Sequence, residues 1–103
     1  MLATYGAQVW LGLSMMVSME LAPFGITSNI LCPGSAVTEI NRELLSDPAV
    51  VARLEARIPL DRLGTVEEIA AVAAFLASDE AAYITGAELV HDGGMTKGGL
   101  WWR

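Results

Sequence analysis

The first 22 positions of the chain are mostly apolar or small and predict one long helix. Apolar residues recur at helical spacing on one side of it, at Leu13, Met16, Val17 and Leu21. The opposite side is also apolar or small, and a helix of this kind is buried on more than one side. We therefore expect a helix from about Leu2 to Ala22 that packs against other protein. Pro23 ends it, because the residue before a proline disfavours the helical conformation.

A buried strand is predicted next, in the stretch from Ile26 to Cys32, and it runs directly into a loop. Its isoleucines and its leucine are good strand residues. Pro33-Gly34 is expected to stop the strand ladder, because proline has no N–H to donate. In open α/β sheets, ligands bind where parallel strands end. The loop from Pro33 to Thr38 is therefore the first candidate for a binding site.

Three helical segments are predicted after this loop, over Glu39–Leu45, Ala49–Arg57 and Val66–Leu76. Thr38 is the predicted N-cap of the first segment. The second follows a cap at Ser46-Asp47 and has a proline, Pro48, at its first helical position. The third opens on a capping box in which Thr65 and Glu68 each satisfy a backbone amide.

A short second strand is predicted over Ala87–His91, and Asp92 caps the sharp turn that follows. The order of strand, helices and strand contains one βαβ unit, so the two strands should be parallel with a right-handed crossover. Two strands do not form a stable sheet alone. We therefore expect an α/β fold in which this chain is a piece of a larger parallel sheet or half of an assembly.

Composition supports this expectation. The apolar fraction is 53% and the charged fraction 17%, against about 25% charged residues in an average soluble domain.

The net charge of −6 and the scattered basic residues argue against nucleic acid as a partner. The single cysteine, Cys32, excludes an internal disulfide framework and a cysteine metal cluster, and it is consistent with a reducing cytoplasm.

The first nineteen residues carry no charge, a feature that signal peptides and membrane spans share. No basic residue precedes the apolar run, polar residues dilute it, and Glu20 ends it. A helix buried against protein is the better interpretation, so no membrane partner is expected.

Several motifs, in their order and spacing, resemble the C-terminal part of the short-chain dehydrogenase/reductase family. They are Asn29-Ile30-Leu31-Cys32-Pro33-Gly34 with Thr38, Ile58-Pro59-Leu60-Asp61-Arg62-Leu63-Gly64, Glu67-Glu68-Ile69-Ala70, Phe75-Leu76-Ala77-Ser78, Tyr83-Ile84-Thr85-Gly86 and Asp92-Gly93-Gly94. The resemblance extends from about Gly12 to Met95, and the run Asp92–Thr96 is similar to the glucose dehydrogenase branch. It implies a Rossmann-type sheet to which this chain contributes the last two strands. Residues 1–103 would form one partial domain, with a tail over 95–103.

The resemblance also implies an oxidoreductase that uses NAD or NADP. By resemblance, Pro33 and Gly34 would flank the nicotinamide, and the Ala36 backbone and the Thr38 hydroxyl would hold its carboxamide. The alternative is a strand-ending turn in which Thr38 is only an N-cap. The glycine pairs near the end of the chain do not open a helix and cannot replace the family's glycine-rich turn. We therefore expect the chain alone to bind a dinucleotide poorly.

The family's catalytic Tyr-x-x-x-Lys has no full counterpart. Counting without a gap places its tyrosine at Ala3 and its lysine at Ala7, while Tyr5 resembles the tyrosine segment displaced by two residues. Val9 stands where a lysine partner of Tyr5 would be. A tyrosine with a pKa of about 10 is poorly matched to neutral pH unless an ammonium group lowers that pKa. Tyr5 is thus a catalytic candidate without its partner, and an aromatic residue near a helix start is the simpler interpretation.

Three other residues have structural interpretations. Asn29 is expected to bridge backbone groups within the core. His91 is expected at a solvent-exposed strand end, and Cys32 is expected to be a small buried hydrophobe. No metal site is predicted.

Two hypotheses remain open. In the first, the chain is the C-terminal part of an NAD(P)-dependent short-chain oxidoreductase, in which it supplies the nicotinamide-side loop and the substrate-covering helices between Glu39 and Leu60. Such a chain would be inactive alone. In the second, it is a non-catalytic module that associates with itself or with a full-length relative through the uncharged first helix and the last strand.

Overall fold

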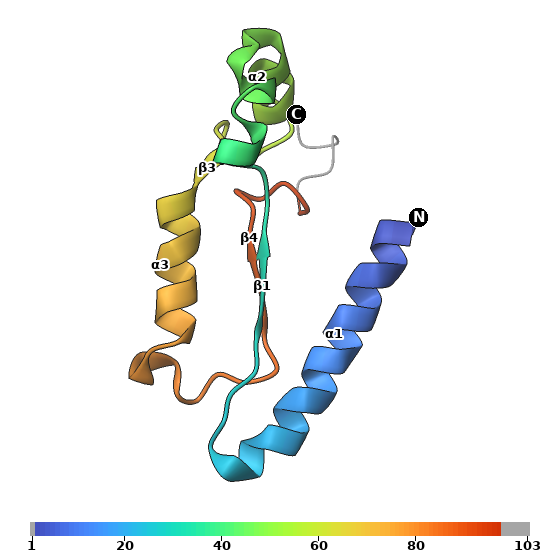
Figure 1. Ribbon diagram of the computed structural model, residues 1–103, viewed down its shortest axis with the longest axis vertical. Helices are drawn as coiled ribbons and strands as arrows, with labels where there is room; N and C mark the ends of the chain where they lie inside the picture. The colour runs from blue at the N-terminus through green and yellow to red at the C-terminus, as the bar shows by residue number, and fades with distance from the viewer. Residues whose placement is uncertain (1, 98–103) are drawn as a thin grey trace. The chain divides into compact units, whose positions relative to one another are not determined.

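The computed structural model describes the backbone of residues 2–97 and the side chains of residues 10–97 of the 103-residue chain. The helices are α1 (Leu2–Leu21), α2 (Pro48–Glu55) and α3 (Val66–Leu76), as Figure 1 shows. Short 3-10 turns lie at η1 (Ala22–Phe24), η2 (Glu39–Asn41), η3 (Leu44–Ser46) and η4 (Asp79–Ala81). The strands are β1 (Ile30–Pro33), β2 (Ala36–Val37), β3 (Gly64–Thr65) and β4 (Glu88–His91).

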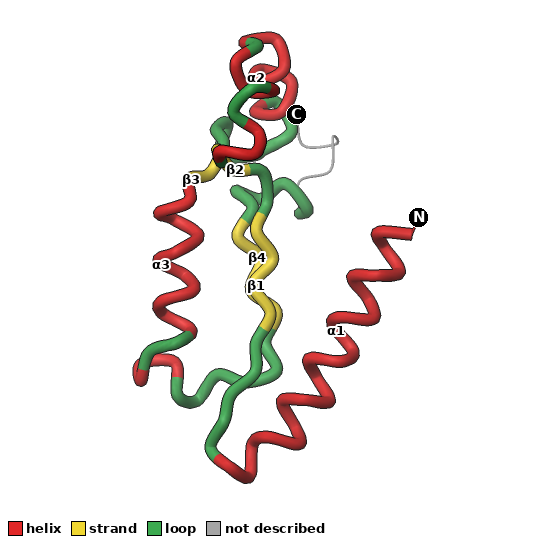
Figure 2. The backbone as a smooth tube through the Cα atoms, in the orientation of Figure 1, coloured by secondary structure: helices red, strands yellow, loops and turns green. Residues whose placement is uncertain are grey.

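The strands form two parallel pairs, β1 with β4 and β2 with β3 (Figure 2). The Ile30 N–H donates to the Ala87 carbonyl (2.9 Å) and the Gly34 N–H to the His91 carbonyl (2.8 Å). Both partners advance by four residues, which is the register of a parallel pair. The predicted parallel strands of an α/β fold are therefore confirmed, although pairing continues through Gly34 and does not stop at Pro33. The β2–β3 pair was not predicted.

The chain divides into two compact units, each built from two distant stretches. The first contains Met1–Leu31 and Val72–Leu89, and the second contains Cys32–Ala71 and Val90–Arg103. The expectation of one partial domain with a tail over 95–103 stays a prediction.

In the first unit, Asn29 joins two segments through its side-chain amide. Its Nδ2 donates to the Ile84 carbonyl (3.0 Å), and its Oδ1 accepts from the Ala87 N–H (3.0 Å). The predicted bridging role of Asn29 is confirmed. Helix α1 approaches the same loop at Gly86, where an added Cβ would lie 3.0 Å from the buried Ser18 hydroxyl oxygen.

In the second unit, the predicted cap of α2 is confirmed and one predicted helix is wrong. The Asp47 carboxylate accepts from the Ala49 N–H at 2.9 Å, with Pro48 at the first helical position. The segment Glu39–Leu45, predicted as a helix, forms part of the turns η2 and η3 instead. The physical reason is local competition. The Asn41 side chain accepts from the Thr38 N–H and donates to the Ala36 carbonyl, which gives this backbone an alternative to the hydrogen bonds of a helix.

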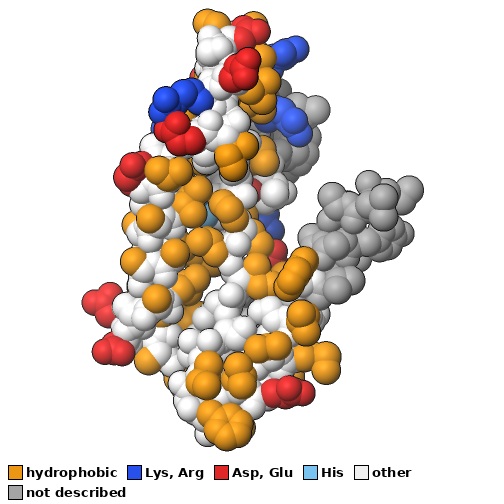
Figure 3. Space-filling model, in the orientation of Figure 1, with side chains coloured by type: hydrophobic (Ala, Val, Ile, Leu, Met, Phe, Trp, Pro, Cys, Tyr) orange, Lys and Arg blue, Asp and Glu red, His pale blue; other side chains and the backbone are white. Residues whose placement is uncertain are grey.

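Few apolar side chains are buried among the described residues. Only Ala36, Ile58 and Ala81 are buried hydrophobic residues there. Large apolar residues in α1 and η1 remain exposed, among them Trp10 (68%), Met19 (73%) and Phe24 (76%). Figure 3 shows hydrophobic side chains at the surface along α3 and the C-terminal part of α1. Large apolar side chains of α1 and α3 are therefore in contact with water in this chain.

Substituting Gly34 should destabilise the second unit. A Cβ at this position would lie 2.6 Å from the Asp92 Cβ and 2.7 Å from its Cα. Because backbone atoms must shift to relieve the overlap, we expect Gly34→Ala to lower the free energy of unfolding by about 1–3 kcal/mol in urea titrations.

Gly12→Ala is the matched control for this substitution. An added Cβ at Gly12 meets nothing within 4 Å in the middle of α1, so this variant should gain roughly 0.5–1 kcal/mol from helix propensity. Equal stability of Gly34→Ala and the wild-type chain would contradict the close approach.

Candidate functional site

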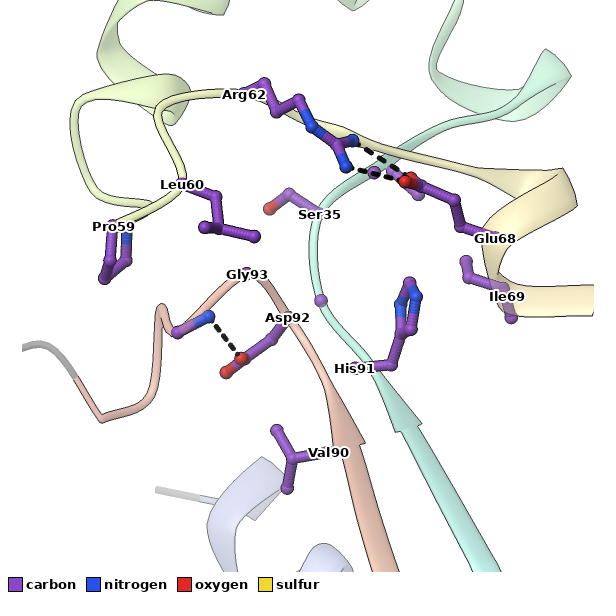
Figure 4. A pocket seen from close by; sticks show the side chains of 14 residues that line it. Ser35, Pro59, Leu60, Arg62, Glu68, Ile69, Val90, His91, Asp92 and Gly93 are labelled. Atoms are coloured by element: carbon purple, nitrogen blue, oxygen red, sulfur yellow. Dashed lines mark hydrogen bonds and ion pairs between the residues drawn. The ribbon is translucent and has the colours of Figure 1, made fainter. Parts of the chain in front are cut away.

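A cavity of about 590 Å³ lies in the second unit, where β1 and β4 end (Figure 4). The residues that line it come from the loop after β1, the connection before β3, the first turn of α3 and the turn after β4. They are Gly34, Ser35, Ala36, Pro59, Leu60, Arg62, Gly64, Glu68, Ile69, Val90, His91, Asp92, Gly93 and Gly94. The carboxyl ends of parallel strands are the usual place for a ligand in an α/β sheet. The cavity is therefore the candidate site.

The structure brings two of the four predicted cofactor residues into this cavity. Gly34 and Ala36 line it, whereas Pro33 and Thr38 are not among its lining residues. Pro33 is exposed at the end of β1, and Thr38 is half-buried at the N-cap of η2. The predicted catalytic candidate, Tyr5, lies in the part of α1 whose side chains the structure does not describe. Contacts of the four loop residues with a cofactor, and a catalytic role for Tyr5, stay predictions.

The loop after β1 is held by neighbouring segments of its own unit. The Gly34 N–H donates to the His91 carbonyl (2.8 Å), and the Ser35 carbonyl accepts from the Gly64 N–H (3.0 Å). The Ala36 carbonyl accepts from the Asn41 side chain (2.7 Å). Sequence reasoning missed Asn41 as part of this site, although its place three residues after a cap at Thr38 is a capping-box signal.

The turn after β4 is closed by the Asp92 carboxylate, as predicted. Its Oδ1 accepts from the Gly94 N–H (2.8 Å) and its Oδ2 from the Thr96 N–H (2.8 Å). A hydrogen bond from the Thr96 side chain is the main cause that lowers the pKa of Asp92, and these backbone N–H groups lower it further. Gly93 has a φ of +62°, and an added Cβ would lie 2.6 Å from Ile58. The turn therefore needs glycine at this position.

An ion pair between Arg62 and Glu68 closes another side of the cavity (Figure 4). The two guanidinium nitrogens lie 3.0 and 2.6 Å from the two carboxylate oxygens. Glu68 also accepts from the Thr65 N–H (3.0 Å), and its own N–H donates to the Thr65 hydroxyl (3.2 Å), so the predicted capping box is confirmed. The hydrogen bond from Arg62, followed by that from the Thr65 N–H, lowers the pKa of the Glu68 carboxylate to about 2. The pairing with Arg62 was not predicted, because it joins an irregular connection to a helix without periodic spacing.

Both carboxylates that line the cavity thus have structural roles. Asp92 closes the turn after β4, and Glu68 forms the ion pair with Arg62, which we call the Arg62–Glu68 clamp. His91 ends β4, is half-buried, and directs its ring into the cavity on the side of Ile69 (Figure 4). Cys32, predicted as buried, is only half-buried within β1. Leu60, Ile69 and Val90 give the cavity an apolar part of its lining, beside the backbone of the strand ends.

Comparison with known proteins identifies the class. The sequence model of a family described as enoyl-(acyl carrier protein) reductase matches residues 9–96. The chain is 45% identical over 85 residues to an L-rhamnose 1-dehydrogenase (NAD(P)(+)) of Azotobacter vinelandii, with 82% of this chain and 33% of that protein covered. It is 46% identical over 85 residues to the 3-oxoacyl-(acyl-carrier-protein) reductase FabG of Salmonella typhimurium, with 82% and 34% covered.

A solved structure of 4-hydroxyisoleucine dehydrogenase complexed with NADH matches the fold with a TM-score of 0.83 and 33% identity, over 89% of this chain and 38% of that one. The chain belongs to the short-chain dehydrogenase/reductase family, and its parallel strands are part of a Rossmann-type α/β fold. It spans about a third of the length of the curated relatives that it matches. In the part of the chain that the structure describes, no helix has the length and apolar character needed to cross a membrane.

Glu68→Gln should reduce the acid sensitivity of the second unit. The pKa of Glu68 is lowered from 4.5 to about 2 in the folded chain, so its contribution to stability is complete above pH 4.5 and is lost as the pH falls toward about 2. We expect the wild-type chain to lose more stability over this range than the variant, measured as the urea midpoint at each pH.

Glu67→Gln removes a neighbouring carboxylate at the start of the same helix and serves as the control. It should leave the acid limb of the profile close to that of the wild-type chain. An acid limb in Glu68→Gln as steep as that of the wild-type chain would show that the clamp does not stabilise the fold.

Proposed function

We propose that this chain supplies the nicotinamide-side loop and the substrate-covering segments of an NAD(P)-dependent oxidoreductase that interconverts a hydroxyl group and a carbonyl group by hydride transfer. The observation that carries the proposal is the loop Pro33–Thr38. It lies at the carboxyl end of β1, and Gly34 and Ala36 line the cavity there. Hydrogen bonds to Gly64, His91 and Asn41 hold its backbone in place.

The proposed cofactor and substrate class follow from the family. The relatives described above include a dehydrogenase whose name specifies NAD(P)(+) and one solved with NADH. A loop that contacts only the nicotinamide end meets the part that NAD and NADP share, so it gives no reason to choose between them. The hydroxyl compounds that we propose as substrates are sugars or other alcohols.

Catalysis would need groups from elsewhere in the fold. Tyr5 has Val9 four residues later in place of a lysine, so nothing at that spacing would lower the pKa of a tyrosine acid from about 10. A pyrophosphate needs a glycine-rich turn that opens a helix. The chain alone should therefore bind the nicotinamide end weakly, and its binding of the whole dinucleotide should not reach saturation.

The proposal predicts a weak, local interaction with reduced nicotinamide mononucleotide. Millimolar additions should shift the backbone amide signals of Ala36 and Thr38 in two-dimensional NMR spectra. Adenosine monophosphate, which has the ribose phosphate but no nicotinamide, is the matched control and should not shift them. In fluorescence titrations, NADH and NADPH should not saturate the chain.

The outcomes separate the alternatives clearly. Equal shifts with both mononucleotides, or shifts with neither, would overturn the nicotinamide role of the loop. Saturable binding of NADH would overturn the expected dependence on the rest of the fold and would call for an activity assay with sugars and alcohols.

A second proposal, favoured by the exposed apolar side chains, is association with another copy of this chain or with a full-length relative. Residues Trp10, Met16 and Met19 of α1 are 68%, 63% and 73% exposed. A helix with such side chains in water gains free energy when another protein surface covers it. No charged residue precedes Glu20 to oppose this packing.

Met19→Glu should weaken self-association by at least about tenfold, which corresponds to about 1.4 kcal/mol, because it would place a carboxylate in an apolar interface. Sedimentation over a range of concentrations measures the effect. Ile40→Glu adds the same charge at a side chain that is 98% exposed on η2 and is the control. A wild-type chain that stays monomeric at all concentrations, or equal effects of both variants, would exclude α1 as the interface.

A further inference from the structure

Asn41 bonds two backbone groups of the candidate loop through one side-chain amide. Its Nδ2 donates to the Ala36 carbonyl at 2.7 Å, and its Oδ1 accepts from the Thr38 N–H at 2.8 Å. The side chain is half-buried in the turn η2, which follows the loop directly. A single primary carboxamide thus satisfies a neighbouring acceptor and donor on one strand.

The two bonded groups lie on one edge of β2. The Ser35 carbonyl accepts from the Gly64 N–H, so it faces β3. Backbone groups of successive strand residues point to alternate edges. The N–H and carbonyl of Ala36 therefore face the opposite edge, and Thr38, which is also extended (φ −133°, ψ 164°), presents its N–H there as well.

This edge could otherwise hold a ligand carboxamide in more than one register. A carboxamide offers one carbonyl acceptor and one N–H donor pair, and it matches the Ala36 carbonyl and the Thr38 N–H as well as it matches other pairs. Asn41 carries the same chemical group and occupies that pair. Its contacts do not use the Ala36 N–H, which by strand geometry points to the same edge.

We propose that Asn41 is a positioning residue for the nicotinamide carboxamide. By occupying the Ala36 carbonyl and the Thr38 N–H, it confines the ligand to a single register, with the ligand carbonyl oxygen at the Ala36 N–H. This inference rests on the proposed nicotinamide role of the loop and adds the residue that sets the ring position.

A role limited to capping η2 is the competing explanation, and Asn41→Asp distinguishes the two. A carboxylate at this position still accepts from the Thr38 N–H, so the cap is kept, but it cannot donate to the Ala36 carbonyl. Asn41→Ala loses both bonds. Ile40→Ala changes the adjacent, 98% exposed residue of the same turn and serves as the control.

Hydrogen exchange and the shifts induced by reduced nicotinamide mononucleotide are measured on the full chain. In Asn41→Ala, the Thr38 amide should exchange about five- to tenfold faster, as for loss of one ordinary hydrogen bond. In Asn41→Asp, it should stay as protected as in the wild-type chain. Both variants lose the bond that holds the Ala36 backbone in position for the ligand, so they should bind the mononucleotide at least about fivefold more weakly, the effect of about one hydrogen bond. Ile40→Ala should match the wild-type chain in both measurements.

Each other result overturns the inference in a recognisable way. Wild-type affinity in Asn41→Asp would leave Asn41 as a cap only, and wild-type affinity in Asn41→Ala would remove any role in binding, while the proposed function stands in both cases. If the mononucleotide does not shift the wild-type loop, the proposed function fails and the inference fails with it.

Discussion

The structure around the candidate site depends on the contact between the ends of β1 and β4. Gly34 donates its N–H to the His91 carbonyl, and the space beside it is filled by the backbone and Cβ of Asp92. Only a residue without a side chain permits this approach. The contact places the turn after β4 against the loop after β1, and the other boundaries of the cavity are built on that arrangement.

A short series of backbone hydrogen bonds then closes the second unit around the cavity. The Leu60 N–H donates to the Gly93 carbonyl (3.2 Å), which attaches the connection before β3 to the turn after β4. That connection ends at Gly64, whose N–H returns to the Ser35 carbonyl. Arg62 and Glu68 fix the connection to the start of α3. Three segments that are distant in sequence are thus held at one strand end, where this class of fold binds ligands.

Both carboxylates at the cavity have structural partners within the chain. Asp92 closes the turn after β4, and Glu68 pairs with Arg62. The chain belongs to the short-chain dehydrogenase/reductase family but spans about a third of its curated relatives. The exposed apolar residues of α1 are the basis of the proposed association with further protein.

The sequence by itself determined the features that depend on near neighbours. The cap at Asp47, the capping box of Thr65 and Glu68, and the turn closed by Asp92 each involve residues within four positions, so a local pattern identifies them. The long apolar helix and the two parallel strands were also predictable, because their hydrophobic residues follow a period or form a short run.

Only the tertiary structure decided which distant segments meet at the site. The β2–β3 pair has two residues in each strand, too few to leave a periodic pattern, and the Arg62–Glu68 pair starts in an irregular connection. The segment after Thr38 has helix-forming residues, yet Asn41 turns its amide to the loop backbone and η2 and η3 form in place of a helix. For the β2–β3 pair and the Arg62–Glu68 pair, the deciding energy comes from a partner that is not a near neighbour in a regular pattern. For Asn41, the choice lies between two local bonding patterns that the sequence alone does not rank. The arrangement of segments around the candidate site could therefore be known only from the folded chain.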